Sequence, residues 1–344
     1  MQHNACFRPE PSLTLALMMQ ALPAEQRLLY PSDGGAALAA SCALTRTGWP
    51  LTPVQAIVSE GQQTLRLYAP ALTLAGLDSL LAGLRWHRLR WLNGDVYELS
   101  VPILPDKALY QSRAEALAVE LIAGPFPSLR EPGLLVMDMD STAICGECID
   151  DIAELAGCGE AVAQVTAQAM RGELDFAESL RLRVAKLAGT PATILERVAN
   201  NLHYTPGIPA LVARLQQAGW QTALVSGGFT FFAHRLQQQL GLSLAEANVL
   251  EIIDGKLTGQ VLGQIVDGNY KKMTLERLRD AAALPARQVL ALGDGANDVP
   301  MLQAAGMGLA YHGKPAVRLA TSGALVHYHA EALLAMLDVE GHHG

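Results

Sequence analysis

The sequence predicts an α/β protein whose main part is a doubly wound parallel sheet, with a helical insert in that part and a separate α+β region ahead of it. From about residue 132 onward, short apolar runs alternate with segments of helical periodicity, which is typical of consecutive βαβ units. Between residues 148 and 202 the periodicity is helical throughout, which indicates an insert without strands. A stretch rich in Pro and Gly at 124–133 precedes this region and indicates a domain boundary.

The first 105 residues predict a small α+β domain in which nothing resembles a catalytic site. Asn93-Gly94 lies between two alternating runs, the strongest short signal for a β-hairpin. The order of elements favours a βαββαβ arrangement. The expected elements are strands at Val54–Val58 and Thr64–Tyr68, a helix at Leu74–Leu84, and hairpin strands at Arg88–Leu92 and Val96–Val101.

The next segment predicts a linker helix, Asp106–Ala123, because apolar residues recur at helical spacing and Gly124-Pro125 can end the helix. The expected divisions of the chain are 1–105 (α+β domain), 106–131 (linker helix and connector), 132–147 with 203–344 (core), and 148–202 (helical cap).

The core and its insert predict the following elements in chain order. They are a strand at Leu134–Met137, insert helices at Ala161–Met170, Phe176–Leu187 and Thr190–Ala199, a helix at Pro209–Ala218, a strand at Gln221–Val225, a helix at Phe231–Leu240, a hairpin at Glu251–Val261, a helix at Lys271–Ala282, and strands at Val289–Leu292, Met307–Ala310 and Ala324–Val326.

Composition excludes several classes of function. The chain has 344 residues, of which 50% are hydrophobic and 17% charged, with a net charge of −8 and no basic block. This argues against nucleic acid or an anionic membrane as the main partner. Cys145 and Cys148 have no second Cys or His pair to complete a zinc site, so reduced thiols in a cytoplasmic protein are expected. No apolar run is long enough to span a membrane, and no cleavage site of a signal peptide follows Leu13–Met19.

Polar side chains follow three predicted core strands at the point where each strand ends. Asp138 and Asp140 follow the first, Ser226 the second and Asp294 the third. Such strand ends converge at one edge of a parallel sheet. Neighbouring carboxylates repel each other unless a divalent cation and an anionic group share the space, and hard oxygen ligands suit Mg²⁺. We therefore expect a magnesium site formed by Asp138, Asp140 and Asp294.

The same edge offers groups that bind a phosphate. The Ser226 hydroxyl and the amide of Gly227 precede a helix and can bind phosphate oxygens. Lys271 adds a fixed positive charge, and the helical frame favours it over Lys272. Asn297 and Asp298 are expected to cap the next helix, which Pro300 would begin, and also to hold Lys271 and the waters of the metal.

These residues suit phosphoryl transfer, which depends on positioning and charge neutralisation. Asp138 is the candidate nucleophile, because a carboxylate can attack phosphorus and form an acyl phosphate. Asp140, two residues on, could protonate the leaving oxygen and later deprotonate the attacking water.

The four motifs together resemble the haloacid dehalogenase-like phosphatases. Asp138-Met-Asp140-Ser-Thr142 matches the DxDx[TV] motif, Ser226 the second motif, Lys271 the third and Gly293-Asp294-Gly-Ala-Asn297-Asp298 the fourth. The matching region runs from about residue 132 to about 330.

A closer resemblance is to the phosphoserine phosphatase family. It is carried by the first motif with its continuation from Asp138 to Glu154, the segment from Phe176 to Val184, and Val225-Ser-Gly-Gly-Phe-Thr230. The resemblance implies that Glu147 contacts the amino group of the substrate, that Arg183 contacts its carboxylate, and that Phe176 covers it. From the residues alone, Glu147 also fits a charge at a helix N-terminus and Arg183 a solvated helix face.

The resemblance implies Mg²⁺-dependent hydrolysis of O-phosphoserine to serine and phosphate through an aspartyl phosphate, the last step of serine biosynthesis. Two alternatives stay open. One is another small substrate, such as phosphothreonine or phosphohomoserine, or transfer to an alcohol. The other is a phosphate-responsive binding module without catalysis. For the first 105 residues the resemblance suggests an ACT-like domain that binds an amino acid, forms a homodimer, or does neither.

Overall fold

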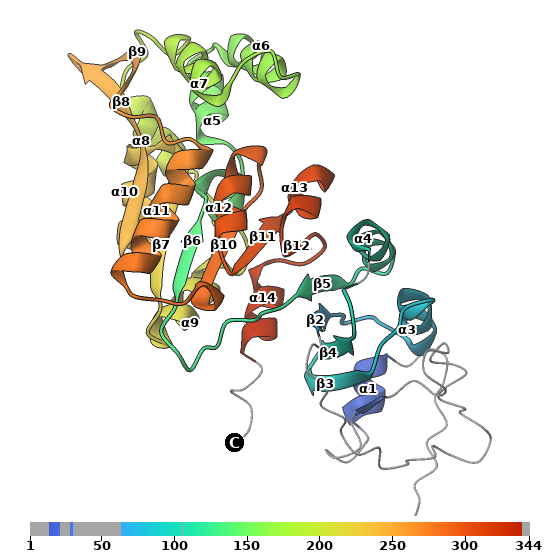
Figure 1. The fold of residues 1–344 in the computed structure, drawn as a ribbon. Helices are drawn as coiled ribbons and strands as arrows, with labels where there is room; N and C mark the ends of the chain where they lie inside the picture. The colour runs from blue at the N-terminus through green and yellow to red at the C-terminus, as the bar shows by residue number, and fades with distance from the viewer. Residues whose placement is uncertain (1–13, 21–27, 30–62, 105, 339–344) are drawn as a thin grey trace, which may run out of the picture. The chain divides into compact units, whose positions relative to one another are not determined.

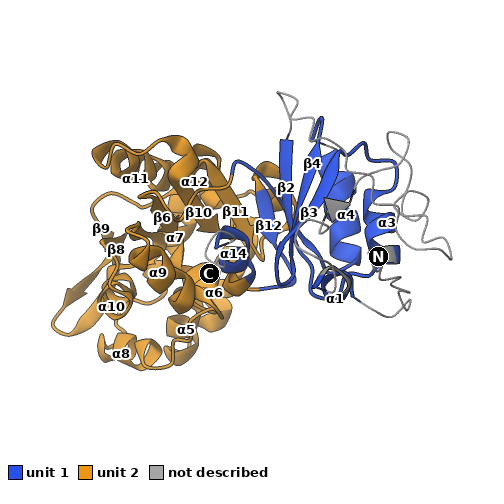
Figure 2. Ribbon diagram, turned by 90° about the horizontal axis from the view of Figure 1, so that it is seen from below, with its two compact units in different colours: residues 1–125, 323–328, 332–344 blue, residues 126–322, 329–331 orange. Residues whose placement is uncertain are grey.

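The computed structural model describes residues 14–20, 28–29, 63–104 and 106–338. The chain divides into two compact units, shown in different colours in Figure 2. Unit 1 is Met1–Pro125 with Gly323–Tyr328 and Ala332–Gly344, and unit 2 is Phe126–Ser322 with His329–Glu331. The strand predicted at Val54–Val58 lies outside the described residues. Among the described helices, none combines the length and the apolar character needed to cross a bilayer.

Unit 1 contains the predicted βαββαβ order in an antiparallel sheet. The hairpin about Asn93-Gly94 is confirmed, with Arg90 opposite Glu98. The sheet order is β1-β3-β4-β2-β5-β12. The elements of this region are α1 (Leu15–Gln20), β1 (Leu28–Leu29), β2 (Gln63–Tyr68), α3 (Leu74–Leu81), β3 (Arg88–Asn93), β4 (Val96–Val101), α4 (Lys107–Ala116), β5 (Glu120–Ala123), β12 (Gly323–Leu325) and α14 (Ala330–Leu337).

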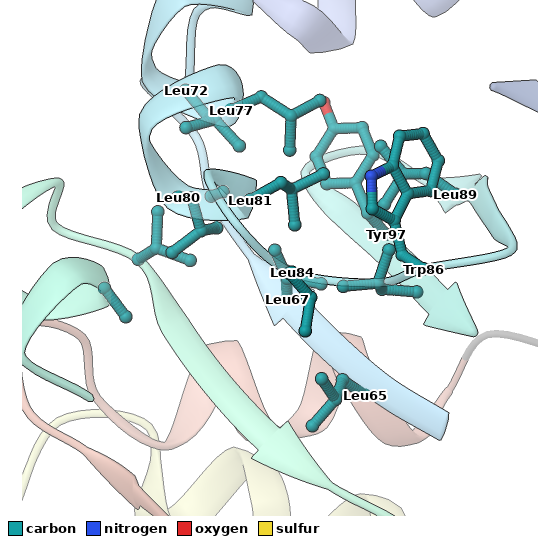
Figure 3. Packing of buried hydrophobic residues seen from close by; sticks show 14 of the residues in the cluster. Leu65, Leu67, Leu72, Leu77, Leu80, Leu81, Leu84, Trp86, Leu89 and Tyr97 are labelled. Atoms are coloured by element: carbon teal, nitrogen blue, oxygen red, sulfur yellow. The ribbon is translucent and has the colours of Figure 1, made fainter. Parts of the chain in front are cut away.

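The core of unit 1 lies between α3 and the sheet. Thr73 caps α3 by accepting a hydrogen bond from the Gly76 N–H at 3.2 Å. Figure 3 shows Leu77, Leu80 and Leu81 of α3 on the side of the sheet that carries Leu67 and Tyr97, which come from two neighbouring strands. Leu77, Leu80 and Leu81 of α3 are buried together with Leu67 and Tyr97, so their apolar surface stabilises the unit.

The helix predicted at Asp106–Ala123 is wrong in its second half. Helix α4 ends at Ala116, Ala118 has φ +51°, and β5 follows. The apolar spacing of this segment fits a helix and a strand equally well. The strand is favoured because Glu120 becomes buried there and accepts three backbone hydrogen bonds, from the N–H groups of Val326–Tyr328 at 2.7–2.9 Å.

Unit 2 has the predicted doubly wound sheet, with the order β11-β10-β6-β7-β8-β9. The first five strands run parallel, and β9 pairs antiparallel with β8 in the predicted hairpin. Figure 2 shows α11 and α12 on one face of the sheet and α9 and α10 on the other. The elements are β6 (Leu134–Met137), α9 (Ile208–Gln217), β7 (Gln221–Phe229), α10 (Thr230–Leu240), β8 (Leu244–Ile253), β9 (Lys256–Leu262), α11 (Gly268–Ala281), β10 (Val289–Gly293), α12 (Val299–Ala304), β11 (Met307–Tyr311) and α13 (Pro315–Ala320).

The helical insert between β6 and β7 lies beyond one end of the sheet, beside the β8–β9 hairpin (Figure 1). Its helices are α5 (Cys148–Leu155), α6 (Gly159–Met170), α7 (Phe176–Ala185) and α8 (Thr193–Ala199). Asp175 and Glu178 form a capping box that begins α7. Helix α8 begins later than predicted, because the carbonyl of Thr190 accepts a hydrogen bond from the Leu257 N–H at 2.9 Å.

Candidate active site

Asp138 lies at the buried end of β6. Its N–H donates to the carbonyl of Leu292 at 3.0 Å, which continues the pairing of β6 with β10. Its Oδ1 accepts a hydrogen bond from the Met139 N–H at 2.7 Å. Its Oδ2 lies 2.8 Å from Nζ of Lys271. The carboxylate is therefore fixed on both oxygens at the edge where the strands converge.

Lys271 is fully buried in the first turns of α11, where the Asp267 side chain accepts from the Tyr270 N–H at 2.8 Å. Its ammonium also lies 2.7 Å from Oδ1 of Asp298. Burial alone would lower the pKa of Lys271, but Asp138 and Asp298 outweigh that effect and raise it above its usual value. The side chain is therefore a permanent cation under the Asp138 carboxylate.

Asp298 precedes α12, and a cap of that helix was one predicted role for this region. Its carboxylate makes no cap bond to α12. Instead, Oδ1 pairs with Lys271, as the sequence also predicted, and Oδ2 accepts from the Gly295 N–H at 3.0 Å.

Ser226, Gly227 and Gly228 form an irregular loop within β7, between the paired residues Val225 and Phe229, and lie beside these acids. Ser226 is buried, and its Oγ accepts a hydrogen bond from the Gly228 N–H at 2.9 Å. The hydroxyl proton is thus available to a further acceptor. A Cβ at Gly227 would lie 2.6 Å from Cζ of Phe176, and one at Gly228 would lie 2.5 Å from Oδ2 of Asp140. A larger residue at either position would therefore force Phe176 or Asp140 to move.

The carboxylates of Asp138, Asp294 and Asp298 form the group suited to a metal, with one oxygen of each within 4.8 Å of the others. Burial and the neighbouring Asp138 raise the pKa of Asp294 to about 7. A set of hard oxygen donors of this kind fits a hard divalent ion. The carboxylate of Asp140, a predicted ligand, does not belong to this group.

Asp140 instead faces the start of α5, where its Oδ1 accepts from the Cys148 N–H at 3.1 Å. Burial and then the charge of Asp138 raise the pKa of Asp140 to about 6, against opposing hydrogen bonds from Cys148. A carboxyl with a pKa near neutrality can donate and accept a proton in one cycle.

The cap contributes side chains of both signs. Phe176 and Arg183 lie two turns apart on α7, so they project from the same face of the helix. Arg183 Nε is buried and has no hydrogen-bond partner among the described residues. Burial and the nearby Asp140 raise the pKa of Glu147 to about 7, and its Oε1 accepts from the Ser141 hydroxyl at 2.9 Å.

These side chains line one cavity of about 360 Å³ between the strand ends and the cap. Lys271 lies beneath it, in contact with Asp138. Asp150 and Lys314 also line the cavity and were not singled out from the sequence. Asp150 lies within the continuation of the first motif, which gave no role for it, and Lys314 belongs to no recognisable motif. The predicted site residues in its lining are Asp138, Asp140, Glu147, Phe176, Arg183, Ser226, Gly227, Asp294 and Asn297.

Comparison with known proteins matches residues 133–306 to the haloacid dehalogenase-like hydrolase family. The phosphoserine phosphatase of Vibrio cholerae is 51% identical over 217 residues, which cover 61% of this chain and 66% of that protein. The phosphoserine phosphatase of Idiomarina loihiensis is 50% identical over 186 residues, 54% of this chain and 84% of that protein. The chain thus spans slightly less than two thirds of the length of the Vibrio relative.

Solved structures agree. The crystal structure of a probable phosphoserine phosphatase from Vibrio cholerae superimposes with a TM-score of 0.67 at 39% identity, covering 80% of this chain and 86% of that one. The structure of a phospho-aspartyl intermediate analogue of a phosphoserine phosphatase superimposes with a TM-score of 0.57 at 34% identity, covering 60% of this chain and 99% of that one. The chain belongs to the haloacid dehalogenase-like hydrolases and, within them, to the phosphoserine phosphatase family.

Proposed function

We propose that this chain is a Mg²⁺-dependent phosphomonoesterase that hydrolyses O-phosphoserine to serine and inorganic phosphate. The observation that carries the proposal is one cavity with two chemically different ends. Asp138, Asp294 and Ser226 lie at the sheet end, above Lys271, and Arg183 lies at the cap end. These ends suit a phosphate and an amino-acid head group. The names of the relatives support the same substrate.

At the phosphate end, Asp138 is the nucleophile. One of its carboxylate oxygens bonds to phosphorus while the bond from phosphorus to the serine oxygen breaks, and Asp140 gives its proton to that oxygen. Water then attacks phosphorus, Asp140 takes the proton, and phosphate leaves Asp138 free. Lys271, the Ser226 hydroxyl and the Gly227 amide stabilise the charge on the phosphoryl oxygens.

A Mg²⁺ ion held by Asp138 and Asp294 would supply charge neutralisation between the phosphate and the acids. The same acids would otherwise repel a phosphate dianion. Asn297 lines the cavity beside Asp294 and is proposed as a hydrogen-bond donor to the phosphate.

At the amino-acid end, Arg183 binds the substrate carboxylate and Glu147 its ammonium group. A buried guanidinium N–H without a partner is costly, and a carboxylate would satisfy it. Phe176 contacts Gly227 across the cavity and would cover the substrate, so that water is excluded during transfer.

Phosphate release from a panel of esters, with Mg²⁺ or with EDTA, tests the proposal. We expect phosphoserine to react fastest, above phosphothreonine and phosphohomoserine, and only when Mg²⁺ is present. Asp138→Asn, checked by mass for deamidation, should remove turnover and keep the fold. A preference for a different ester would change the substrate, and full activity of Asp138→Asn would exclude the carboxylate nucleophile. Homodimerisation stays a prediction, which the mass in solution tests.

A further inference from the structure

Asn248 lies on β8, and only 1% of its surface is exposed. Its Nδ2 donates to the carbonyl of Gly227 at 2.8 Å, and its Oδ1 accepts from the N–H of Val266 at 2.9 Å. We propose that Asn248 is a positioning residue that orients the Ser226 hydroxyl and connects its loop to the segment that begins α11. Its kinetic consequence rests on the proposed function.

The first step concerns a single peptide unit. The carbonyl of Gly227 and the N–H of Gly228 belong to the same peptide plane. The carbonyl accepts from Asn248, and the N–H donates to Oγ of Ser226 at 2.9 Å. Because the plane is rigid, fixing one end fixes the other. Asn248 therefore determines the direction of the bond that the Ser226 oxygen accepts.

Glycine makes this restraint necessary. Both residues of the unit are glycines, which have little intrinsic preference for one backbone conformation. Larger residues do not fit, because Phe176 and Asp140 occupy the space of the Cβ atoms. The two glycines therefore bring no side chains that could stiffen their peptide unit, and besides Ser226 Oγ the amide of Asn248 supplies a restraint from the neighbouring strand.

The other end of Asn248 reaches the start of α11. Val266, whose N–H it binds, directly precedes Asp267, and the carbonyl of Asp267 accepts from the Lys271 N–H at 3.0 Å. One buried amide thus joins the strand end that carries Ser226 to the helix that carries Lys271. Both groups are proposed to contact the same phosphate, so their spacing decides how well it is bound.

The test compares Asn248→Leu with Gln288→Met, two isosteric replacements of buried amides in unit 2. Gln288 is also 1% exposed, and it bonds to the backbone of Ser128, Glu131 and Pro132. It precedes β10, at the end of that strand away from Asp294. Asn248→Asp is the second variant, since it keeps the acceptor for Val266 and loses the donor to Gly227. The measurements are inorganic phosphate binding by calorimetry in Mg²⁺ buffer, and kcat and KM for phosphoserine per folded molecule.

We expect Asn248→Leu and Asn248→Asp to weaken phosphate binding and to lower kcat by about tenfold or more, the usual effect of one lost buried hydrogen bond. The phosphate affinity and kcat of Gln288→Met should stay within about twofold of those of the wild type, even if this variant melts at a lower temperature. Phosphate binding and kcat in both Asn248 variants equal to those of Gln288→Met would overturn the inference. A wild type that binds phosphate but hydrolyses no ester would overturn the proposed function alone, since the binding comparison would still stand.

Discussion

Replacing Lys271 with Met should strongly destabilise unit 2 in the absence of metal. The ammonium lies 2.8 Å from a carboxylate oxygen of Asp138 and 2.7 Å from one of Asp298, with no exposed surface. At an effective dielectric constant of about 20, opposite charges at this distance attract by roughly 6 kcal/mol per contact, which the desolvation of the ions largely offsets. Removing one partner leaves the acids unpaired and costs about 3–5 kcal/mol. In a unit of roughly 200 residues this corresponds to a melting temperature lower by about 6–20 °C.

The loss should depend on pH. Because the pKa of Lys271 is raised in the folded state, its stabilisation is complete below the unfolded pKa of about 10.4 and is lost only as pH rises through the folded value. It is therefore fully present at pH 8. The pKa of Asp294 is raised to about 7, so this neighbouring acid gains a proton below that pH and the excess negative charge falls. The destabilisation by Lys271→Met should therefore be larger at pH 8 than at pH 5.5.

Calorimetry of EDTA-treated protein measures this effect. The matched control is Lys272→Met on the same helix, since Lys272 is half exposed and lies 3.9 Å from Glu276, a pair expected to contribute less than about 1 kcal/mol. The double variant Lys271→Met/Asp298→Asn should recover about half of the lost stability, because it removes one of the two carboxylates that are left without a cationic partner. Melting of Lys271→Met within 2 °C of Lys272→Met at pH 8 would refute this account of the cluster.

Three further predictions follow from single contacts. Arg183→Ala should raise KM for phosphoserine at least about tenfold with a smaller effect on kcat, whereas the exposed Arg181→Ala should change neither; equal effects of the two in steady-state kinetics would contradict the carboxylate contact. Gly227→Ala should lower kcat/KM, because its Cβ would lie 2.6 Å from Phe176, and adding Phe176→Leu should restore part of the loss; no rescue would speak against this clash. Glu120→Ala should lower the free energy of unfolding of unit 1 by about 3 kcal/mol or more, as three backbone N–H groups lose their acceptor; an unchanged calorimetric transition would contradict this.

Much of the fold could be predicted because its signals are local. A buried strand followed at once by acids, as in Leu134–Met137 with Asp138, contains both the element and its edge in a few consecutive residues. The segment at Glu120–Ala123 could not be predicted in this way. Its apolar residues fit either period, and the partners that decide for a strand, Val326–Tyr328, lie about two hundred positions later in the chain.

The site residues likewise fall into those that a local sequence signal predicts and those that only the folded structure identifies. Asp138 and Asp294 could be predicted because each directly follows a strand, and parallel strands bring their ends together. Ser226 could be predicted because it follows the apolar run of β7, although the strand resumes at Phe229. Asn248 could not, because a single amide inside a strand has no pattern, and its partners are 21 and 18 residues away. The choice of Asp298 over Asp140 in the acidic group also depends on how each carboxylate turns within its loop, which spacing does not encode.

Charge balance connects the metal, the substrate and the stability of the cleft. Lys271 already contacts two carboxylates, and ionisation of Asp294 and Glu147 remains unfavourable, since burial and neighbouring acids raise the pKa of each to about 7. A divalent ion at Asp294 and a substrate ammonium at Glu147 would each supply the positive charge that these acids lack. Below pH 7 protons take that role and compete with both ligands. Mg²⁺ and the substrate ammonium therefore reduce the repulsion between the acids of the cleft. Because fewer protons compete at high pH, Mg²⁺ should raise the melting temperature more at pH 8 than at pH 5.5.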